Sequence, residues 1–154
     1  MLFHVVFDCD GTLVDTSSTK YSLYPSIKTI LTELSQVAVL SVWTARDRVS
    51  TLRILSENQV SQFFEAIYSS DDAYPKPHVK GLQELTCGAE KSKVFVIGDS
   101  SVDMIGAKNF GAKAIGALWN GQSHPNLLLE AGADYLASTP QECFDWIMSQ
   151  LQDS

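Results

Sequence analysis

Residues 3–11 read Phe-His-Val-Val-Phe-Asp-Cys-Asp-Gly, an apolar run that ends in two aspartates and a glycine. Consecutive apolar positions are typical of a central strand covered by helices on both faces of a sheet. Residues two apart in extended chain share a face, so we expect Asp8 and Asp10 to point the same way. Gly11 allows a sharp turn close to a ligand, although Asp-Gly also occurs in ordinary turns. The stretch predicts a ligand site at the carboxyl end of a strand.

Short apolar runs alternate with helical patterns along the rest of the chain, which is typical of βαβ units. We predict an α/β fold with a doubly wound, Rossmann-like, mostly parallel sheet and helices on both faces. No repeat or linker interrupts the pattern, so residues 1–154 are expected to form a single domain. The predicted strands are 3–7, 37–43, 66–69, 94–97, 113–118 and 134–136, and the predicted helices are 25–36, 46–58, 78–86, 101–110, 124–131 and 140–151.

The composition is that of an acidic globular chain. Of 154 residues, 45% are hydrophobic, and 11 Lys and Arg stand against 18 Asp and Glu for a net charge of −7. This balance disfavours a nucleic-acid partner or an anionic membrane surface, since both need clustered basic residues. Cys9, Cys87 and Cys143 lack Cys-x-x-Cys spacing, which disfavours a disulfide framework and a structural zinc site. With no signal-peptide pattern and no apolar stretch near the roughly 18 residues of a membrane span, we expect a cytoplasmic protein.

Two more polar motifs follow predicted strands. Thr44 presents a hydroxyl beside backbone N–H groups such as that of Ala45, a pattern that can bind an anion. The alternative is that Thr44 caps a helix with Asp47 as its capping-box partner. Lys76 lies between Pro75 and Pro77, which restrict the backbone. That restriction favours a fixed phosphate contact over the solvated surface charge that a lysine usually provides.

The last motif, Gly98-Asp99-Ser100-Ser101-Val102-Asp103, follows the strand at 94–97. Asp99 could be only a helix N-cap, with Asp103 one turn later. If this strand neighbours the one at 3–7, however, the motif brings more carboxylates beside Asp8 and Asp10, and these repel one another unless a cation offsets them. Oxygen ligands without His or Cys favour Mg²⁺.

Taken in order, these motifs resemble the haloacid dehalogenase superfamily of phosphatases, and the likeness spans nearly the whole chain. Three downstream stretches, 108–112, 118–121 and 131–136, look like its phosphoglycolate-phosphatase branch. The motifs that carry the likeness are Asp8-x-Asp10-Gly11-Thr12-Leu13-Val14-Asp15, Thr44, Lys76-Pro77 and Gly98-Asp99-Ser100-x-x-Asp103.

The resemblance implies a mechanism through an aspartyl-phosphate. It makes Asp8 the nucleophile, and it makes Asp10 the acid that protonates the leaving oxygen and the base that activates water. It implies that Mg²⁺ is held by Asp8, by the backbone carbonyl of Asp10 and by Asp99. Thr44 would bind a phosphate oxygen, and Lys76 would neutralise the phosphoryl group and Asp8. Supporting positions are Gly11, Ala45, Ser100 and Asp103, the last orienting Lys76 or a metal-bound water.

Relatives of the phosphoglycolate-phosphatase type usually carry a helical cap domain between the first and the second motif. Here only residues 11–43 separate Asp10 from Thr44, and only residues 45–75 separate Thr44 from Lys76. Each interval suffices for a helix and a strand, so we predict a capless, open core. Shielding of the site is then expected from a homo-oligomer partner or from the loop at 15–24.

The predicted activity is Mg²⁺-dependent hydrolysis of a phosphate monoester, on a small phosphorylated metabolite such as a sugar phosphate or phosphoglycolate. A phosphatase of a phosphorylated macromolecule is the near alternative. A non-hydrolytic, receiver-like phospho-switch is disfavoured, because residues 45–65 lack an aspartate at a strand end. An idle interaction module is disfavoured by the intact acidic motifs and Lys76. Trp119, Asn120 and Gly121 could line the pocket or end a strand, and the second interpretation is favoured. Arg46 is given no role.

Overall fold

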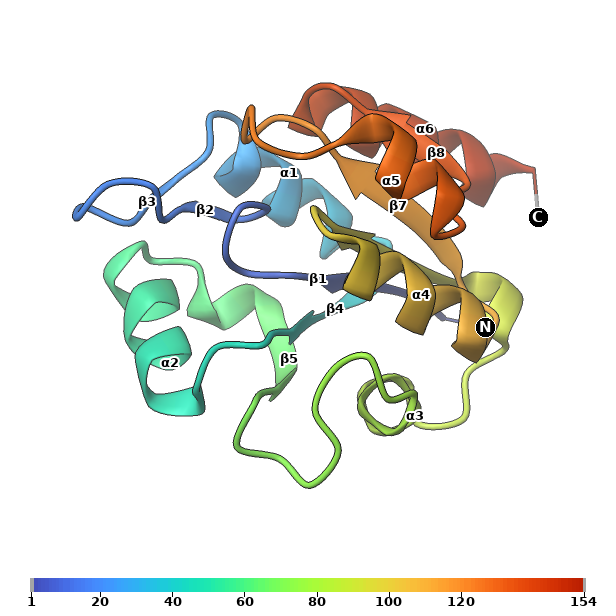
Figure 1. Ribbon diagram of the computed structural model, residues 1–154, viewed down its shortest axis with the longest axis horizontal. Coiled ribbons are helices and arrows are strands. Elements are labelled where there is room, and N and C mark those ends of the chain that lie inside the picture. The colour runs from blue at the N-terminus through green and yellow to red at the C-terminus, as the bar shows by residue number, and fades with distance from the viewer. Residues whose placement is uncertain (1, 154) are drawn as a thin grey trace.

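The apolar run near the start of the chain forms β1, Phe3–Phe7, in the middle of a six-stranded parallel sheet (Figure 1). The computed structural model describes residues 2–153. The strand order is β5-β4-β1-β6-β7-β8, and all neighbours are parallel. The other strands are β4 (Ala38–Trp43), β5 (Phe64–Tyr68), β6 (Val94–Gly98), β7 (Lys113–Ala117) and β8 (Tyr135–Ala137).

Helices cover both faces of the sheet, as predicted for a doubly wound fold. α1 (Ile27–Leu34) and α6 (Pro140–Gln152) pack into one buried cluster, which also takes residues of α2 (Arg48–Glu57). A second cluster on the other face joins α3 (Lys80–Thr86), α4 (Ser101–Phe110) and α5 (Pro125–Glu130). Figure 1 shows α6 and α3 on opposite sides of the sheet. None of the helices described here is long and apolar enough to cross a membrane.

The predicted elements are all present, but most of their bounds move. The strand at 3–7 and the helix at 101–110 are confirmed residue for residue. The strand expected at 66–69 begins earlier, at Phe64, and the helices expected to begin at 25 and 78 begin two residues later. A hairpin of β2 (Val14–Asp15) and β3 (Ser22–Leu23) was not predicted, because two-residue strands are too short to show an alternating pattern.

The register of the central strands brings the predicted motifs to one edge of the sheet. Phe7, the last residue of β1, pairs with Val42 of β4 and with Ile97 of β6. The backbone N–H of Asp8 then donates to the carbonyl of Ile97 at 2.9 Å. The residues that follow these three strands therefore meet at the carboxyl edge, where open α/β sheets bind ligands.

Below that edge, two helices approach the buried ring of Trp43 through glycines. A Cβ at Gly81 or at Gly106 would lie inside van der Waals contact of the indole, and at Gly106 it would also lie 3.1 Å from the carbonyl oxygen of Pro77. Trp43 is only 1% exposed, so the ring cannot move aside into solvent. The glycines thus set how closely α3 and α4 pack beneath the site.

We expect Gly106→Ala to lower the free energy of unfolding by about 1–3 kcal/mol, the usual cost of overpacking a filled core. The loss should appear even though alanine favours a helix over glycine by about 1 kcal/mol. Urea denaturation midpoints measure it. Asn109→Ala, at an exposed position of the same helix, is the matched control and should leave stability unchanged or slightly higher. Equal stability of the two variants would contradict the tight packing on Trp43.

Candidate active site

A pocket of about 490 Å³ lies at the carboxyl edge of the sheet. Every residue predicted for the site lines this pocket except Gly11, which lines an adjoining cavity of about 330 Å³. Two residues that sequence reasoning left without a role, Arg46 and Val102, complete the wall. The predicted members of the lining are Asp8, Asp10, Thr44, Ala45, Lys76, Asp99, Ser100 and Asp103.

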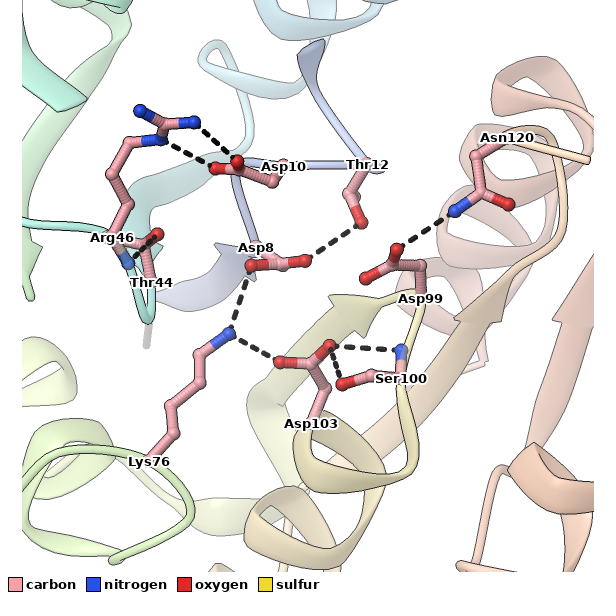
Figure 2. Close-up of polar contacts among 10 residues, drawn as sticks. All are labelled: Asp8, Asp10, Thr12, Thr44, Arg46, Lys76, Asp99, Ser100, Asp103 and Asn120. Carbon is pink, nitrogen blue, oxygen red and sulfur yellow. Dashed lines mark hydrogen bonds and ion pairs between the residues drawn. The ribbon is translucent and has the colours of Figure 1, made fainter. Parts of the chain in front are cut away.

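The centre of the site is a buried lysine between two carboxylates. The Lys76 ammonium donates to Asp8 Oδ1 at 3.0 Å and forms a second, shorter ion pair with Asp103 (Figure 2). Its side chain is only 5% exposed. Burial alone would lower the pKa of Lys76, but the two carboxylates outweigh burial and raise it. The lysine therefore keeps its charge, and Asp103 holds it against Asp8.

Asp103 also completes the first turn of α4. Its Oδ2 accepts hydrogen bonds from the backbone N–H of Ser100 at 3.2 Å and from the Ser100 hydroxyl at 3.0 Å (Figure 2). Ser100, and not Asp99, is the N-cap of the helix, so the alternative that gave Asp99 only a capping role is wrong. The Asp99 carboxylate is left facing the site, where Asn120 Nδ2 donates to it at 2.9 Å.

Gly11 allows Asp99 to reach this position. Its φ is +78°, a conformation that L-residues with a side chain rarely adopt. A Cβ at Gly11 would also overlap the carboxylate of Asp99. The turn after β1 therefore requires glycine twice, once for its backbone and once for the space that Asp99 fills.

Asp10 lines the same pocket as Asp8, but its carboxylate has other partners. β1 ends at Phe7, so the alternation of an extended strand does not continue to Asp10. Its carboxylate instead accepts two hydrogen bonds from Arg46, from Nε at 2.9 Å and from Nη2 at 2.7 Å, whereas Asp8 contacts Lys76 and Thr12 (Figure 2). No sequence signal predicted the Arg46 pair, since it joins positions 36 apart in the chain.

Thr44 is buried at the end of β4 and does not cap α2. Its hydroxyl accepts a hydrogen bond from the backbone N–H of Arg46 at 3.0 Å. The cap of α2 is Asp47, whose side chain accepts from the backbone N–H of Ser50 at 2.9 Å. The capping-box alternative for Thr44 is therefore wrong, and its hydroxyl lies in the pocket wall with the exposed Ala45 beside it.

The acidic groups fit a divalent cation. Carboxylate oxygens of Asp8, Asp99 and Asp103 lie within 4.8 Å of one another. Burial, with the charge of Asp103 added to it, raises the pKa of Asp8 well above its usual value, and burial likewise raises that of Asp99. Lys76 is the single cation among these three carboxylates, so the cluster is short of positive charge. Lys76 and Ser100 engage both oxygens of Asp103, and Lys76 and Thr12 engage both oxygens of Asp8.

The hairpin loop at 15–24 lies beside the site. The Tyr21 ring covers the Arg46 guanidinium, with 5.3 Å between the ring centroid and Cζ. Tyr24 lines the adjoining cavity together with Asp10 and Asp99. Trp119 does more than end a strand, because its indole N–H donates to the carbonyl of Thr12 at 2.9 Å. These contacts join parts of the chain too distant for a sequence pattern to relate.

Comparison with known proteins gives relatives that are named phosphatases. The phosphoglycolate phosphatase of Agrobacterium fabrum is 30% identical over 125 residues, 76% of this chain and 53% of that protein. The phosphoglycolate phosphatase of Vibrio parahaemolyticus is 27% identical over 128 residues, 80% of this chain and 55% of that protein. The pyrophosphatase PpaX of Halalkalibacterium halodurans is 29% identical over 96 residues, 59% of this chain and 42% of that protein. This chain spans about half the length of the curated relatives it matches.

Solved structures repeat the fold. A haloacid dehalogenase-like hydrolase of Streptococcus pneumoniae superposes with a TM-score of 0.79 at 22% identity, over 94% of this chain and 98% of that one. A haloacid dehalogenase-like protein of Agrobacterium tumefaciens superposes with a TM-score of 0.85 at 16% identity, over 98% of this chain and 100% of that one. The pattern of the haloacid dehalogenase-like hydrolase family matches residues 17–117, a segment that includes Thr44, Lys76 and Asp99. With more than half of its residues matched in this way, the chain belongs to the haloacid dehalogenase-like hydrolases.

Proposed function

We propose that this protein is a Mg²⁺-dependent phosphatase that hydrolyses phosphate monoesters through an aspartyl-phosphate. The observation that supports it most is the environment of Asp8, a buried carboxylate between the Lys76 ammonium and the carboxylate of Asp99. A carboxylate held in place by a fixed cation is equipped to attack phosphorus. The names of the relatives, phosphoglycolate phosphatase and pyrophosphatase, support phosphoryl chemistry.

In the first step, an oxygen of Asp8 forms a bond to phosphorus while the bond between phosphorus and the ester oxygen breaks. Asp10, protonated at the start of the cycle, donates that proton to the departing oxygen, which leaves as an alcohol. In the second step, Asp10 takes a proton from water, which attacks the aspartyl-phosphate and frees Asp8 and inorganic phosphate. Asp10 lines the same pocket as Asp8 and is half-exposed, at 39% of its side chain, so it can serve both steps.

The other residues provide charge and hydrogen bonds to the phosphoryl oxygens. Lys76 offsets the negative charge of Asp8 as the phosphate approaches, and the Thr44 hydroxyl donates to a phosphate oxygen. We assign the metal ligands as the side chains of Asp8 and Asp99 with the backbone carbonyl of Asp10. Bound Mg²⁺ would supply positive charge between Asp8 and the phosphate. Asp103 holds Lys76, and Ser100 holds Asp103. Gly11 leaves room for Asp99, and Ala45 lines the pocket beside Thr44.

The proposed substrate is a small phosphorylated metabolite, such as a sugar phosphate or phosphoglycolate. A pocket of about 490 Å³ is large enough for such a molecule. We further propose that one capless core carries the site, since the chain between Asp10 and Thr44 forms only the β2–β3 hairpin, α1 and β4. The hairpin loop at 15–24, through Tyr21 and Tyr24, then takes part of the shielding role of a cap. Shielding by a second copy stays a prediction.

Asp8→Asn should abolish turnover, because an amide cannot form the phosphoenzyme. We expect at least a 10³-fold loss of kcat, on the order seen when a covalent nucleophile is removed. Phosphate release in the presence of Mg²⁺ measures it, and circular dichroism should show an intact fold. Asp145→Asn, an exposed acid of α6, is the matched control. Retained activity of the Asp8→Asn variant would remove the nucleophile assignment. In the wild type, an Asp8 that stays phosphorylated for minutes without turnover would favour a phospho-switch instead.

Asp99→Asn should raise the Mg²⁺ concentration needed for half-maximal phosphate release by about 10–100-fold, the usual scale for disturbing a metal site. The amide keeps an oxygen and can still accept from Asn120, but it loses the charge that binds the cation. Titration of Mg²⁺ into EDTA-treated protein gives the value, with Asp145→Asn again as control. An unchanged Mg²⁺ requirement would contradict the role of Asp99 as a ligand.

The stability of the metal-free protein should also depend on pH through Asp8 and Asp99. Burial raises the pKa values of Asp8 and Asp99 above those of the unfolded chain, so the folded protein binds their protons more tightly. That contribution is fully present below the unfolded pKa near 4 and is lost as pH rises through the folded values. In EDTA, the stability of Asp99→Asn relative to that of the wild type should therefore increase as the pH is raised from 4 to 8. Melting temperatures at both pH values test this, and a constant difference would refute it.

A further inference from the structure

The pocket has two cationic side chains, and Arg46 is the more exposed of the two. Lys76 is 5% exposed and is committed to Asp8 and Asp103. Arg46 is 21% exposed and lies at the wall of the same pocket. Any part of a substrate beyond its reacting phosphate therefore meets Arg46 as the first available positive charge.

The hydrogen bonds of Arg46 leave part of its guanidinium free. Of its five N–H donors, Nε and Nη2 each give one to Asp10, and Nη1 gives one to Ser50 Oγ at 3.3 Å. Two donors remain beyond those given to Asp10 and Ser50. The Tyr21 ring covers a face of the guanidinium, and the Tyr21 side chain also takes a hydrogen bond from Arg46, so at least one donor stays available. Arg46 can thus hold Asp10 and still bind a second anion.

The position of Arg46 relative to the reaction fixes where that anion must be. Under the proposed function, Asp10 protonates the oxygen of the leaving group, and Arg46 contacts Asp10 directly at 2.7 Å. The group attached to that oxygen must therefore pass beside the guanidinium. An anion within a few bonds of the ester oxygen would reach Arg46, whereas one at the far end of a long substrate would not.

We infer that Arg46 contacts substrate and selects phosphate compounds whose leaving group bears a second anionic group, a carboxylate or a further phosphate, close to the scissile bond. This inference rests on the proposed function and narrows its substrate class. It favours short anionic esters over sugar phosphates, whose hydroxyl groups are neutral. Arginine suits this role because it stays charged and has enough donors to hold Asp10 and still donate to a second anion.

The test uses two esters that differ in one group. 2-Phosphoglycolate and 2-hydroxyethyl phosphate present a carboxylate and a hydroxymethyl group at the same position. We expect kcat/KM of the wild type to be at least about 10-fold higher for phosphoglycolate, since a charge-assisted hydrogen bond suffices for a factor of that size. Arg46→Gln should bring the ratio close to one, mainly through a higher KM for phosphoglycolate. Inorganic pyrophosphate in parallel shows whether the second anion is a phosphate.

Arg53→Gln is the matched control, because Arg53 lies exposed on α2 and the same charge is removed away from the pocket. It should leave the ratio unchanged. If Arg46→Gln unfolds, Arg46→Lys replaces it, since lysine keeps the charge without the paired donors and should also lower the ratio.

Two results would overturn the inference. One is a wild type that favours neither phosphoglycolate nor pyrophosphate over 2-hydroxyethyl phosphate. The other is an equal fall of kcat/KM on all substrates in Arg46→Gln, which would mean that Arg46 acts only by holding Asp10. p-Nitrophenyl phosphate separates these results from failure of the proposed function. If hydrolysis of p-nitrophenyl phosphate depends on Mg²⁺ and on Asp8, the proposed phosphatase activity is supported and only the Arg46 inference fails. If no substrate is hydrolysed, both proposals fail.

Discussion

The ion pair of Lys76 with Asp8 is the interaction on which the rest of the site depends. Two charges this far from water are stable only when the geometry is good and further hydrogen bonds complete it. Asp103 provides that completion, since it binds Lys76 through one oxygen and the N-terminal turn of α4 through the other. The same carboxylate therefore orients the lysine and fixes the helix that follows Asp99. Without Asp103, the lysine would have one carboxylate partner and Asp99 would lose the fixed start of its neighbouring helix.

Sequence periodicity and strand-end chemistry predicted the architecture and most of the pocket lining. The reason is physical: parallel strands end at a common edge, so any polar residue just after β1, β4 or β6 arrives there whatever the details of the turns. Lys76 follows a longer loop, and the prolines on either side of it were the signal that it has a fixed position.

What could not be predicted depends on side-chain directions and on contacts between distant parts of the chain. The pairing of Asp10 with Arg46 needs knowledge that β1 stops at Phe7, and the contact of Asn120 with Asp99 joins two different loops. The β2–β3 hairpin was not predicted because its strands have only two residues each. Period-based reasoning finds elements long enough to show a repeating buried face, and none of these contacts depends on such a repeat.

One consequence of the packing under the site concerns Trp43. Its ring lies 5.0 Å from the Lys76 ammonium and touches α3 and α4 where both have glycine. Displacement of the indole would thus be transmitted to the amine without any change in a polar residue. Substitution of Gly81 or Gly106, two positions outside the pocket, would therefore disturb the ion pair between Lys76 and Asp8.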